Sequence, residues 1–99
     1  MKIYISGKIS GIEEEAFRLF DSKEKVLMDE GHDVVNPMKL RHDHDKSWKS
    51  YMIEDIKALV DCDAIYMLKN WTESQGAVIE HGLAESLGIK IIYDKKLTP

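Results

Sequence analysis

Cysteine is almost absent from the 99-residue sequence, in which Cys62 is the only one. A single cysteine excludes an intrachain disulfide and a cysteine-based metal cluster. Cys62 opens an apolar run, where the ordinary role of cysteine is that of a small buried hydrophobic side chain. Because the N-terminus also has strand character and shows no signal peptide, we expect a cytoplasmic protein.

Long hydrophobic runs and an excess of basic residues are also missing. No segment approaches the roughly 20 apolar residues that a membrane-spanning helix needs. The formal charge is −4 and the acids and bases are interspersed, whereas a protein that binds nucleic acid polymers usually carries a basic face. We therefore expect neither a membrane nor a nucleic acid polymer as partner, although a local pocket can still bind a single nucleotide.

The sequence has the composition of an ordinary globular protein, with 43% hydrophobic and 32% charged residues. Its length suits one hydrophobic core, so we predict a single domain over residues 1–99. Short β-rich segments alternate with longer helical ones. Strands are expected at residues 2–6, 32–35, 64–68 and 89–93, and helices at 12–30, 47–60 and 74–87, with a loop at 38–46.

This alternation predicts an α/β fold: a doubly wound parallel sheet, Rossmann- or flavodoxin-like, with helices on both faces and strand order 2-1-3-4. Ligands of such sheets bind beyond the carboxyl ends of the strands. The loops that follow Ser6, Val35 and Leu68 should therefore surround one crevice.

Two carboxylates fall on the apolar sides of their helices. In the third helix, Glu80 lies near the middle of an apolar arc of about 160° that contains Ala77, Ile79, Leu83, Ala84 and Leu87. In the second helix, Asp55 lies on the side defined by Trp48, Tyr51, Met52, Ile56 and Leu59. An unpaired buried carboxylate is costly or stays protonated, so such positions call for an explanation.

Two explanations are open for these acids. Each can lie at the edge of its apolar stripe and cap a loop, or pair with a lysine such as Lys8 or Lys49, as structural ion pairs do. Alternatively, both face the crevice, where paired acids in different environments are suited to glycosidic chemistry. One carboxylate then attacks or stabilises the anomeric carbon, and the other handles the proton of the leaving group.

Three further features lie near the expected crevice. The segment Ser6–Gly11 (Ser-Gly-Lys-Ile-Ser-Gly) can present backbone N–H groups to a phosphate beside Lys8, or can be a plain tight turn. Ser74 can cap the third helix or contact a phosphate. Trp48 and Trp71 are candidates for stacking on a base.

The cluster Arg41-His42-Asp43-His44-Asp45 has the residue types of a metal site. No distant third histidine or cysteine completes an obvious set of ligands. A solvated loop over the pocket is the better interpretation. We expect no metal and no cofactor.

Several short motifs match a known family together. They are Tyr4-Ile5-Ser6-Gly7 with the loop to Gly11, Asn36-Pro37, Asp55, Asp63, Ser74 and Gly76-Ala77-Val78-Ile79-Glu80 with Ala84. On these residues the chain resembles the nucleoside 2-deoxyribosyltransferase-like superfamily over nearly its whole length. It is most similar to the small members, which include 2′-deoxynucleoside 5′-phosphate N-hydrolases.

The resemblance implies a role for each matching residue. Glu80 matches the nucleophile that attacks C1′ of the deoxyribose, and Asp55 matches the aspartate that helps to protonate the departing base. Tyr4 matches the tyrosine that orients the glutamate, and Ser74 the serine that binds the 5′ end. The expected substrate-binding residues are Ser6, Gly7, Lys8, Ser10, Gly11, Ser74 and Gly76. The resemblance also implies a homodimer or a larger homo-oligomer.

The first loop departs from the family pattern. Where the nucleotide hydrolases carry a serine and then an arginine that grip phosphate, this chain has Lys8 and Ser10. The expected function is cleavage or transfer at the N-glycosidic bond of a deoxynucleoside or its 5′-monophosphate. A non-catalytic nucleotide-binding module and an interaction domain on the same fold are the alternatives.

Overall fold

The computed structural model describes residues 1–94, and its sheet has the predicted strand order. Four strands run parallel in the order β2-β1-β3-β4. In chain order the elements are β1 (Lys2–Ser6), α1 (Glu13–Asp29), β2 (Asp33–Val35), the 3-10 helix η1 (Pro37–Lys39), α2 (Trp48–Val60), β3 (Ala64–Met67), the 3-10 helix η2 (Trp71–Glu73), α3 (Gln75–Leu87) and β4 (Lys90–Tyr93).

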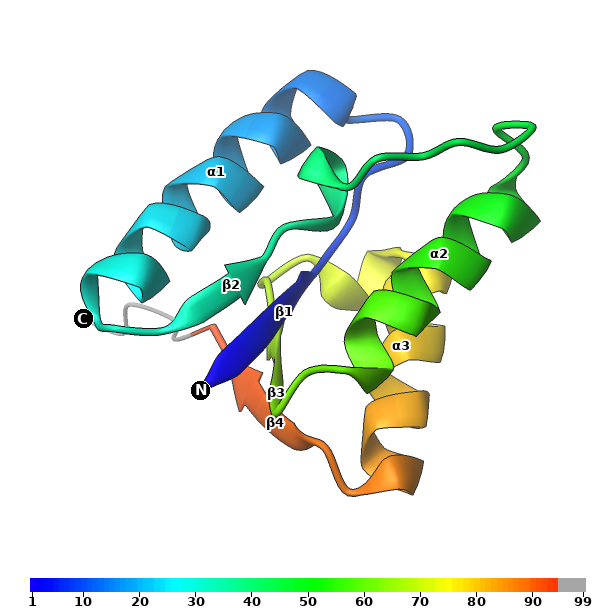
Figure 1. Ribbon diagram of the computed structural model, residues 1–99. Coiled ribbons are helices and arrows are strands. Elements are labelled where there is room, and N and C mark those ends of the chain that lie inside the picture. The colour runs from blue at the N-terminus through cyan, green and yellow to red at the C-terminus, as the bar shows by residue number, and fades with distance from the viewer. Residues whose placement is uncertain (95–99) are drawn as a thin grey trace.

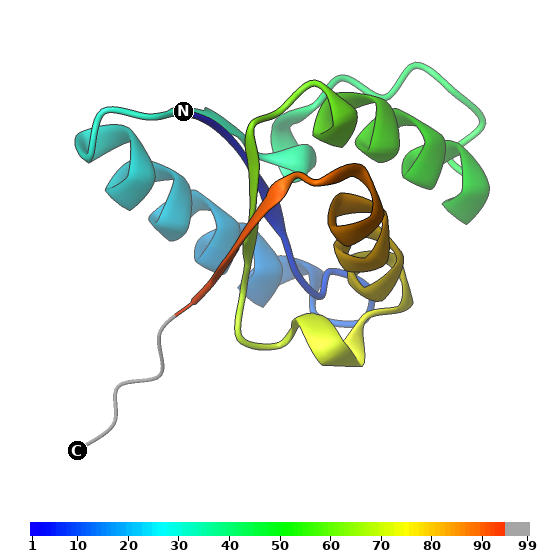
Figure 2. The same cartoon turned by 90° about the horizontal axis from the view of Figure 1, so that it is seen from below.

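Helices cover both faces of the sheet, as the alternating pattern predicted. Helix α1 lies on one face, and α2 and α3 lie together on the other (Figures 1 and 2). Each face has its own cluster of buried side chains. The α1 side includes Ile3, Ile5 and Phe20, and the α2/α3 side includes Tyr4, Leu59 and Ile65. The doubly wound α/β prediction is therefore confirmed.

Strand β1 distributes its side chains to both faces because successive residues of a strand point to opposite sides. Ile3 and Ile5 pack toward α1. Tyr4 packs toward α2 and α3, and Ser6 contacts α3 through a hydrogen bond to Glu80. Two polar side chains of one strand, two residues apart, thus reach the same helix.

Helix α3 has clear start and stop signals. At its N-terminus the Ser74 side chain accepts a hydrogen bond from the backbone N–H of Ala77 at 3.1 Å. At its C-terminus Gly88 has a φ of 73° and a left-handed conformation, which glycine adopts without the steric cost of a Cβ atom. The chain direction therefore changes sharply at Gly88 before β4.

Two short 3-10 helices lie in segments expected to be loops. The first, η1, starts at Asn36, whose side-chain oxygen accepts a hydrogen bond from the N–H of Met38 at 3.0 Å, with Pro37 at the first helical position. The second, η2, follows β3. Both occur at the carboxyl ends of strands, and both η1 and η2 contribute residues to the same edge of the sheet.

The apolar arcs predicted for α2 and α3 are too wide. In α3 the buried residues are Ala77, Glu80 and Ala84, whereas Ile79 and Leu87 are exposed. The covered face of α3 is therefore a narrow stripe made of two small alanines and Glu80. None of the helices in residues 1–94 is both long and apolar enough to span a membrane.

Candidate functional site

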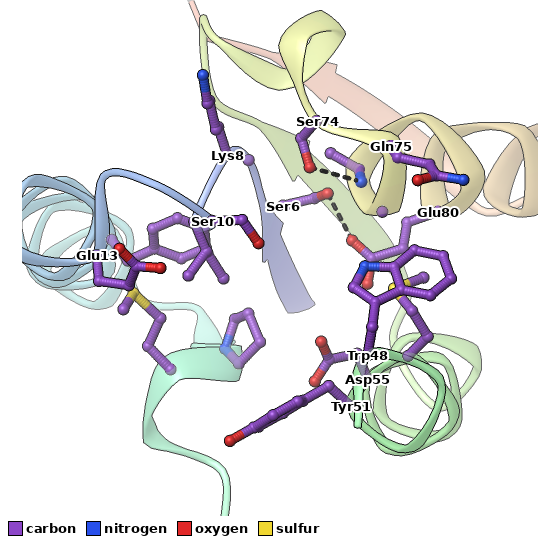
Figure 3. Close-up of a pocket in the computed structure, with 18 of the residues that line it drawn as sticks. Ser6, Lys8, Ser10, Glu13, Trp48, Tyr51, Asp55, Ser74, Gln75 and Glu80 are labelled. Carbon is purple, nitrogen blue, oxygen red and sulfur yellow. Dashed lines mark hydrogen bonds between the residues drawn. The ribbon is translucent and has the colours of Figure 1, made fainter. Parts of the chain in front are cut away.

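A cavity of about 660 Å³ opens where the sequence predicted a crevice, beyond the carboxyl ends of the strands. The end of β1 and the loop after it form one wall, and α2 and the start of α3 form another (Figure 3). Residues of η1 and the following loop also line it. The expected site residues that line this cavity are Tyr4, Ser6, Gly7, Lys8, Ser10, Trp48, Asp55, Ser74, Gly76 and Glu80.

Glu80 is the buried carboxylate at the base of this cavity, with only 5% of the residue exposed. The Tyr4 hydroxyl donates a hydrogen bond to its Oε2 atom and the Ser6 hydroxyl donates one to its Oε1 atom, both at 2.7 Å. Each carboxylate oxygen is therefore held by one donor from β1. This arrangement fixes the plane of the carboxylate and leaves each oxygen further lone pairs.

Burial raises the pKa of Glu80 to about 7, although the hydrogen bonds from Tyr4 and Ser6 act in the opposite direction. The nearby charge of Asp55 raises it further. Burial also raises the pKa of the Tyr4 hydroxyl well above its usual range. Tyr4 therefore keeps its proton at neutral pH and stays a hydrogen-bond donor to Glu80.

Asp55 is the second buried acid of the cavity. Its side chain is 14% exposed, and its Oδ1 atom is buried with no hydrogen-bond partner among the described residues. Burial and then the charge of Glu54 raise its pKa to about 7. The nearest basic group to Oδ1 is Nε2 of His42, at 4.0 Å, which is too long for a hydrogen bond.

The two acids thus differ in how they are held but both titrate near neutral pH. Glu80 has two fixed donors, whereas Asp55 has an oxygen left open. A pair of carboxyls with raised pKa values can keep one proton between them at neutral pH. One member can then act as a nucleophile or base while the other donates a proton.

Pairing with a lysine, one of the alternatives for these acids, is not what the structure shows. The lysine nearest the cavity is Lys8, whose Nζ atom lies 3.9 Å from Oε1 of Glu73. Within residues 1–94 neither Glu80 nor Asp55 forms an ion pair with a lysine. The interpretation of the two carboxylates as members of structural ion pairs with lysines is therefore wrong.

The loop after β1 approaches Leu68 so closely that only glycine fits at position 7. A Cβ atom on Gly7 would lie 2.8 Å from a side-chain carbon of Leu68, so the loop and the end of β3 pack directly on each other. Gly11 has a φ of 85°, in the left-handed region. Gly11 itself lies outside the residues that line the cavity, in contrast to Ser10.

The start of α3 brings Ser74 and Gly76 to the cavity. Ser74 caps the helix, which was one of its two expected roles, and its hydroxyl also faces the cavity (Figure 3). A Cβ atom on Gly76 would lie 3.0 Å from the sulfur of Met52. Gly76 therefore allows α3 to pack against α2 beside the site.

The two tryptophans have different positions. Trp48 lines the cavity and is 50% exposed, so one part of its ring is accessible to a ligand. Trp71 does not line the cavity: its ring stacks on His81 with a centroid distance of 4.3 Å. The expectation that Trp71 stacks on a base does not fit this position, because the His81 ring already occupies one face.

The side chains of the histidine-rich loop, residues 41–45, contact one another and α2. Nδ1 of His42 lies 3.0 Å from Nε2 of His44, and both rings pack edge-on against Tyr51. Within residues 1–94 no group of three or more His, Cys, Asp or Glu side chains is arranged to hold a metal ion. His42 nevertheless lines the cavity, so this loop forms part of its wall.

Several residues of the cavity wall were not predicted from the sequence. They are Glu13, Phe20, Met38, Tyr51, Met52, Glu73 and Gln75. Glu73 and Gln75 flank Ser74, which the sequence had identified, so their proximity could have been inferred. Tyr51 lies one helical turn before Asp55 and was assigned to the apolar side of α2, yet it is 37% exposed.

Comparison with solved structures supports the resemblance at the level of the fold. A 2-deoxyribosyltransferase from the psychrotolerant bacterium Bacillus psychrosaccharolyticus matches with a TM-score of 0.75 and 21% identity, covering 100% of this chain and 77% of that chain. A conserved protein from Enterococcus faecalis V583 matches with a TM-score of 0.70 and 20% identity, covering 94% of this chain and 62% of that chain.

The nucleoside deoxyribosyltransferase-like fold is thereby confirmed, while identities this low carry no information about activity. No curated protein matches the chain. Residues 1–93 match a family that is described as a domain of unknown function, DUF4406. Since this match covers nearly the whole sequence, the chain belongs to the DUF4406 family.

Proposed function

We propose that this protein cleaves or transfers at the N-glycosidic bond of a deoxynucleoside or its 5′-monophosphate, with Glu80 as nucleophile. The observation that carries the proposal is the buried Glu80 carboxylate, whose two oxygens are each held at 2.7 Å by a hydroxyl of β1 at the base of an open cavity. A carboxylate fixed in this way is oriented for attack on one carbon atom.

In the proposed reaction, a Glu80 oxygen forms a bond to C1′ as the bond from C1′ to the base nitrogen breaks. Asp55, whose pKa of about 7 keeps part of its population protonated at neutral pH, donates its proton to the departing base. Water, or the nitrogen of a second base, then attacks C1′ and releases the Glu80 carboxylate. Asp55 accepts the proton of the incoming nucleophile, so the enzyme returns to its starting state.

Other cavity residues have supporting roles in this proposal. Tyr4 and Ser6 orient Glu80, and Trp48 offers a partly exposed ring on which a base can stack. Ser74 lies at the start of α3, where a hydroxyl can bind the 5′ end of the substrate. Assembly into a homo-oligomer and a cytoplasmic location stay predictions.

The test is base release from the four deoxynucleosides and their 5′-monophosphates, followed by chromatography. We expect Glu80→Gln, which keeps the side-chain volume but not the charge, to lower the rate by about 10³-fold or more. The matched control is Glu85→Gln, which changes an exposed glutamate of the same helix. It should release base at the wild-type rate.

Two results would count against the proposed reaction. Full activity in Glu80→Gln would exclude Glu80 as the nucleophile. A nucleoside or nucleotide that raises the melting temperature without any base release would instead favour a non-catalytic binding module.

A further inference from the structure

We propose that Glu13 is a specificity-determining residue that makes the cavity exclude phosphorylated ligands and admit those with an uncharged 5′ end. This inference rests on the proposed function, since it concerns the substrate of the same site. It is carried by the position of Glu13, by the partners of the loop N–H groups and by the charges that line the cavity.

Glu13 is the first residue of α1, and its carboxylate lines the cavity opposite α3 (Figure 3). Its Oε2 atom accepts a hydrogen bond from the backbone N–H of Gly11 at 3.0 Å. Bonds from backbone N–H groups of Glu13 itself and of Gly11 lower the pKa of this carboxyl, so it is ionised at neutral pH. The positive end of α1, where a phosphate would bind, therefore already holds an anion of the chain itself.

Two further N–H groups of the loop are also engaged. The N–H of Lys8 donates to Oδ1 of Asn70 at 3.0 Å. The N–H of Ile12 donates to the carbonyl oxygen of Ile9 at 3.1 Å. A loop that binds phosphate leaves such donors free to converge on the anion. Here three donors of the loop, those of residues 8, 11 and 12, already have acceptors within the protein.

The charge of Lys8 is also balanced within the protein. Its ammonium nitrogen lies 3.9 Å from a carboxylate oxygen of Glu73, which also lines the cavity. Lys8 is the only lysine or arginine among the cavity-lining residues of the described chain, whereas four acids line it: Glu13, Asp55, Glu73 and Glu80. A phosphate with a charge near −2 would be repelled by the Glu13 carboxylate, while the pairing with Glu73 weakens its attraction to Lys8.

A neutral 5′-hydroxyl meets a different environment. The hydroxyl groups of Ser10 and Ser74 line the same part of the cavity, on the loop after β1 and at the start of α3 (Figure 3). A serine hydroxyl both donates and accepts hydrogen bonds, so it can pair with the hydroxyl of a sugar. The carboxylate of Glu13 is a further acceptor for such a group.

The experiment compares one deoxynucleoside with its 5′-monophosphate, using kcat/KM in the wild type, Glu13→Gln and Glu14→Gln. Glutamine keeps an acceptor for the Gly11 N–H and removes the charge. We expect the wild type to prefer the nucleoside at least tenfold, and Glu13→Gln to reduce this preference about tenfold. Glu14→Gln, which alters an exposed acid paired with Arg18, should keep the wild-type ratio.

Calorimetry of the same two ligands with the Glu80→Gln variant measures binding without base release. It therefore tests the ligand preference separately from the proposed reaction. Selective binding of the nucleoside without base release by the wild type would support the role of Glu13 and overturn the proposed activity. Equal or tighter binding of the monophosphate would overturn the role of Glu13 even if base is released. An unchanged ligand preference in Glu13→Gln would overturn it too.

Discussion

The raised pKa values of Glu80 and Asp55 have the same main cause but different consequences for stability. Burial disfavours the charged form of both carboxyls. Two hydroxyl donors compensate the charge on Glu80, whereas Oδ1 of Asp55 has no hydrogen-bond partner among residues 1–94. The negative charge of ionised Asp55 therefore has fewer stabilising hydrogen bonds than that of Glu80. Replacing the Asp55 carboxyl by a neutral group should stabilise the fold.

We expect Asp55→Asn to be more stable than the wild type at pH 8 and to lose this advantage toward pH 5. In the unfolded chain an aspartate titrates near pH 4, and in the folded chain the pKa of Asp55 is about 7. Between these values the folded state binds more protons, so the wild type loses stability as pH rises. The advantage at pH 8 should be roughly 2 kcal/mol, measured by urea denaturation at both pH values.

The control for this measurement is Asp29→Asn, which removes the charge of an exposed aspartate in α1. Its stability relative to the wild type should be nearly the same at pH 5 and pH 8. If Asp55→Asn shows no pH-dependent difference from the wild type, the carboxyl of Asp55 does not titrate near pH 7 in the folded protein.

The helical pattern was enough to identify Glu80 and Asp55, because each acid falls on the apolar side of its helix. It did not identify their partners, although the family resemblance implied that Tyr4 orients Glu80. That Tyr4 and Ser6 both reach Glu80 depends on the packing of α3 against β1, which brings together residues 76 and 74 positions apart. The ion pair between Lys8 and Glu73 could not be predicted either, because these residues follow different strands and meet only in the fold.

At the scale of the element, Gly82 inside α3 and Gly88 at its C-cap have contrasting conformations. Gly82 lies within the helix, and a Cβ atom there would meet nothing within 4 Å. Gly88 ends the helix with a φ of 73°. The same substitution to alanine should therefore have opposite effects at positions six residues apart.

We expect Gly82→Ala to raise the free energy of unfolding by about 0.5–1 kcal/mol, since alanine loses less backbone entropy in a helix. We expect Gly88→Ala to lower it by about 1 kcal/mol, because a Cβ atom is strained in the left-handed conformation. Urea denaturation of both variants provides the measurement. A loss of stability in Gly82→Ala would mean that α3 packs against a surface beyond the described chain.

The boundaries of the helices and strands were predicted to within one or two residues, because caps, glycines and apolar runs mark them locally. Exposure within the helices was predicted less well. Trp48 and Tyr51 belong to the apolar side of α2 but are 50% and 37% exposed, since the N-terminal part of α2 lines an open cavity. Periodicity identifies the apolar face of a helix without showing which part of that face another element covers.

At the scale of the whole molecule, both hydrophobic clusters are built on the same strands. Residues of β1 and β3 contribute to the cluster on the α1 side and to the cluster on the α2/α3 side. Loss of packing on one face should therefore weaken the sheet on which the other face depends. This shared sheet supports the single-domain prediction, which was made from the length of the chain and stays a prediction.

We expect Phe20→Leu to shift the whole unfolding transition, although Phe20 lies in α1 and the two tryptophans do not. Phe20 is fully buried, and its truncation should cost about 1 kcal/mol, or a melting-temperature shift of about 4–8 °C for a domain of this size. Tryptophan fluorescence and far-ultraviolet circular dichroism should report the same shift. Phe17→Leu in the same helix, where the ring is 51% exposed, should change little. A fluorescence transition that stays at the wild-type temperature while the dichroism moves would instead show that α1 unfolds independently of the α2/α3 side.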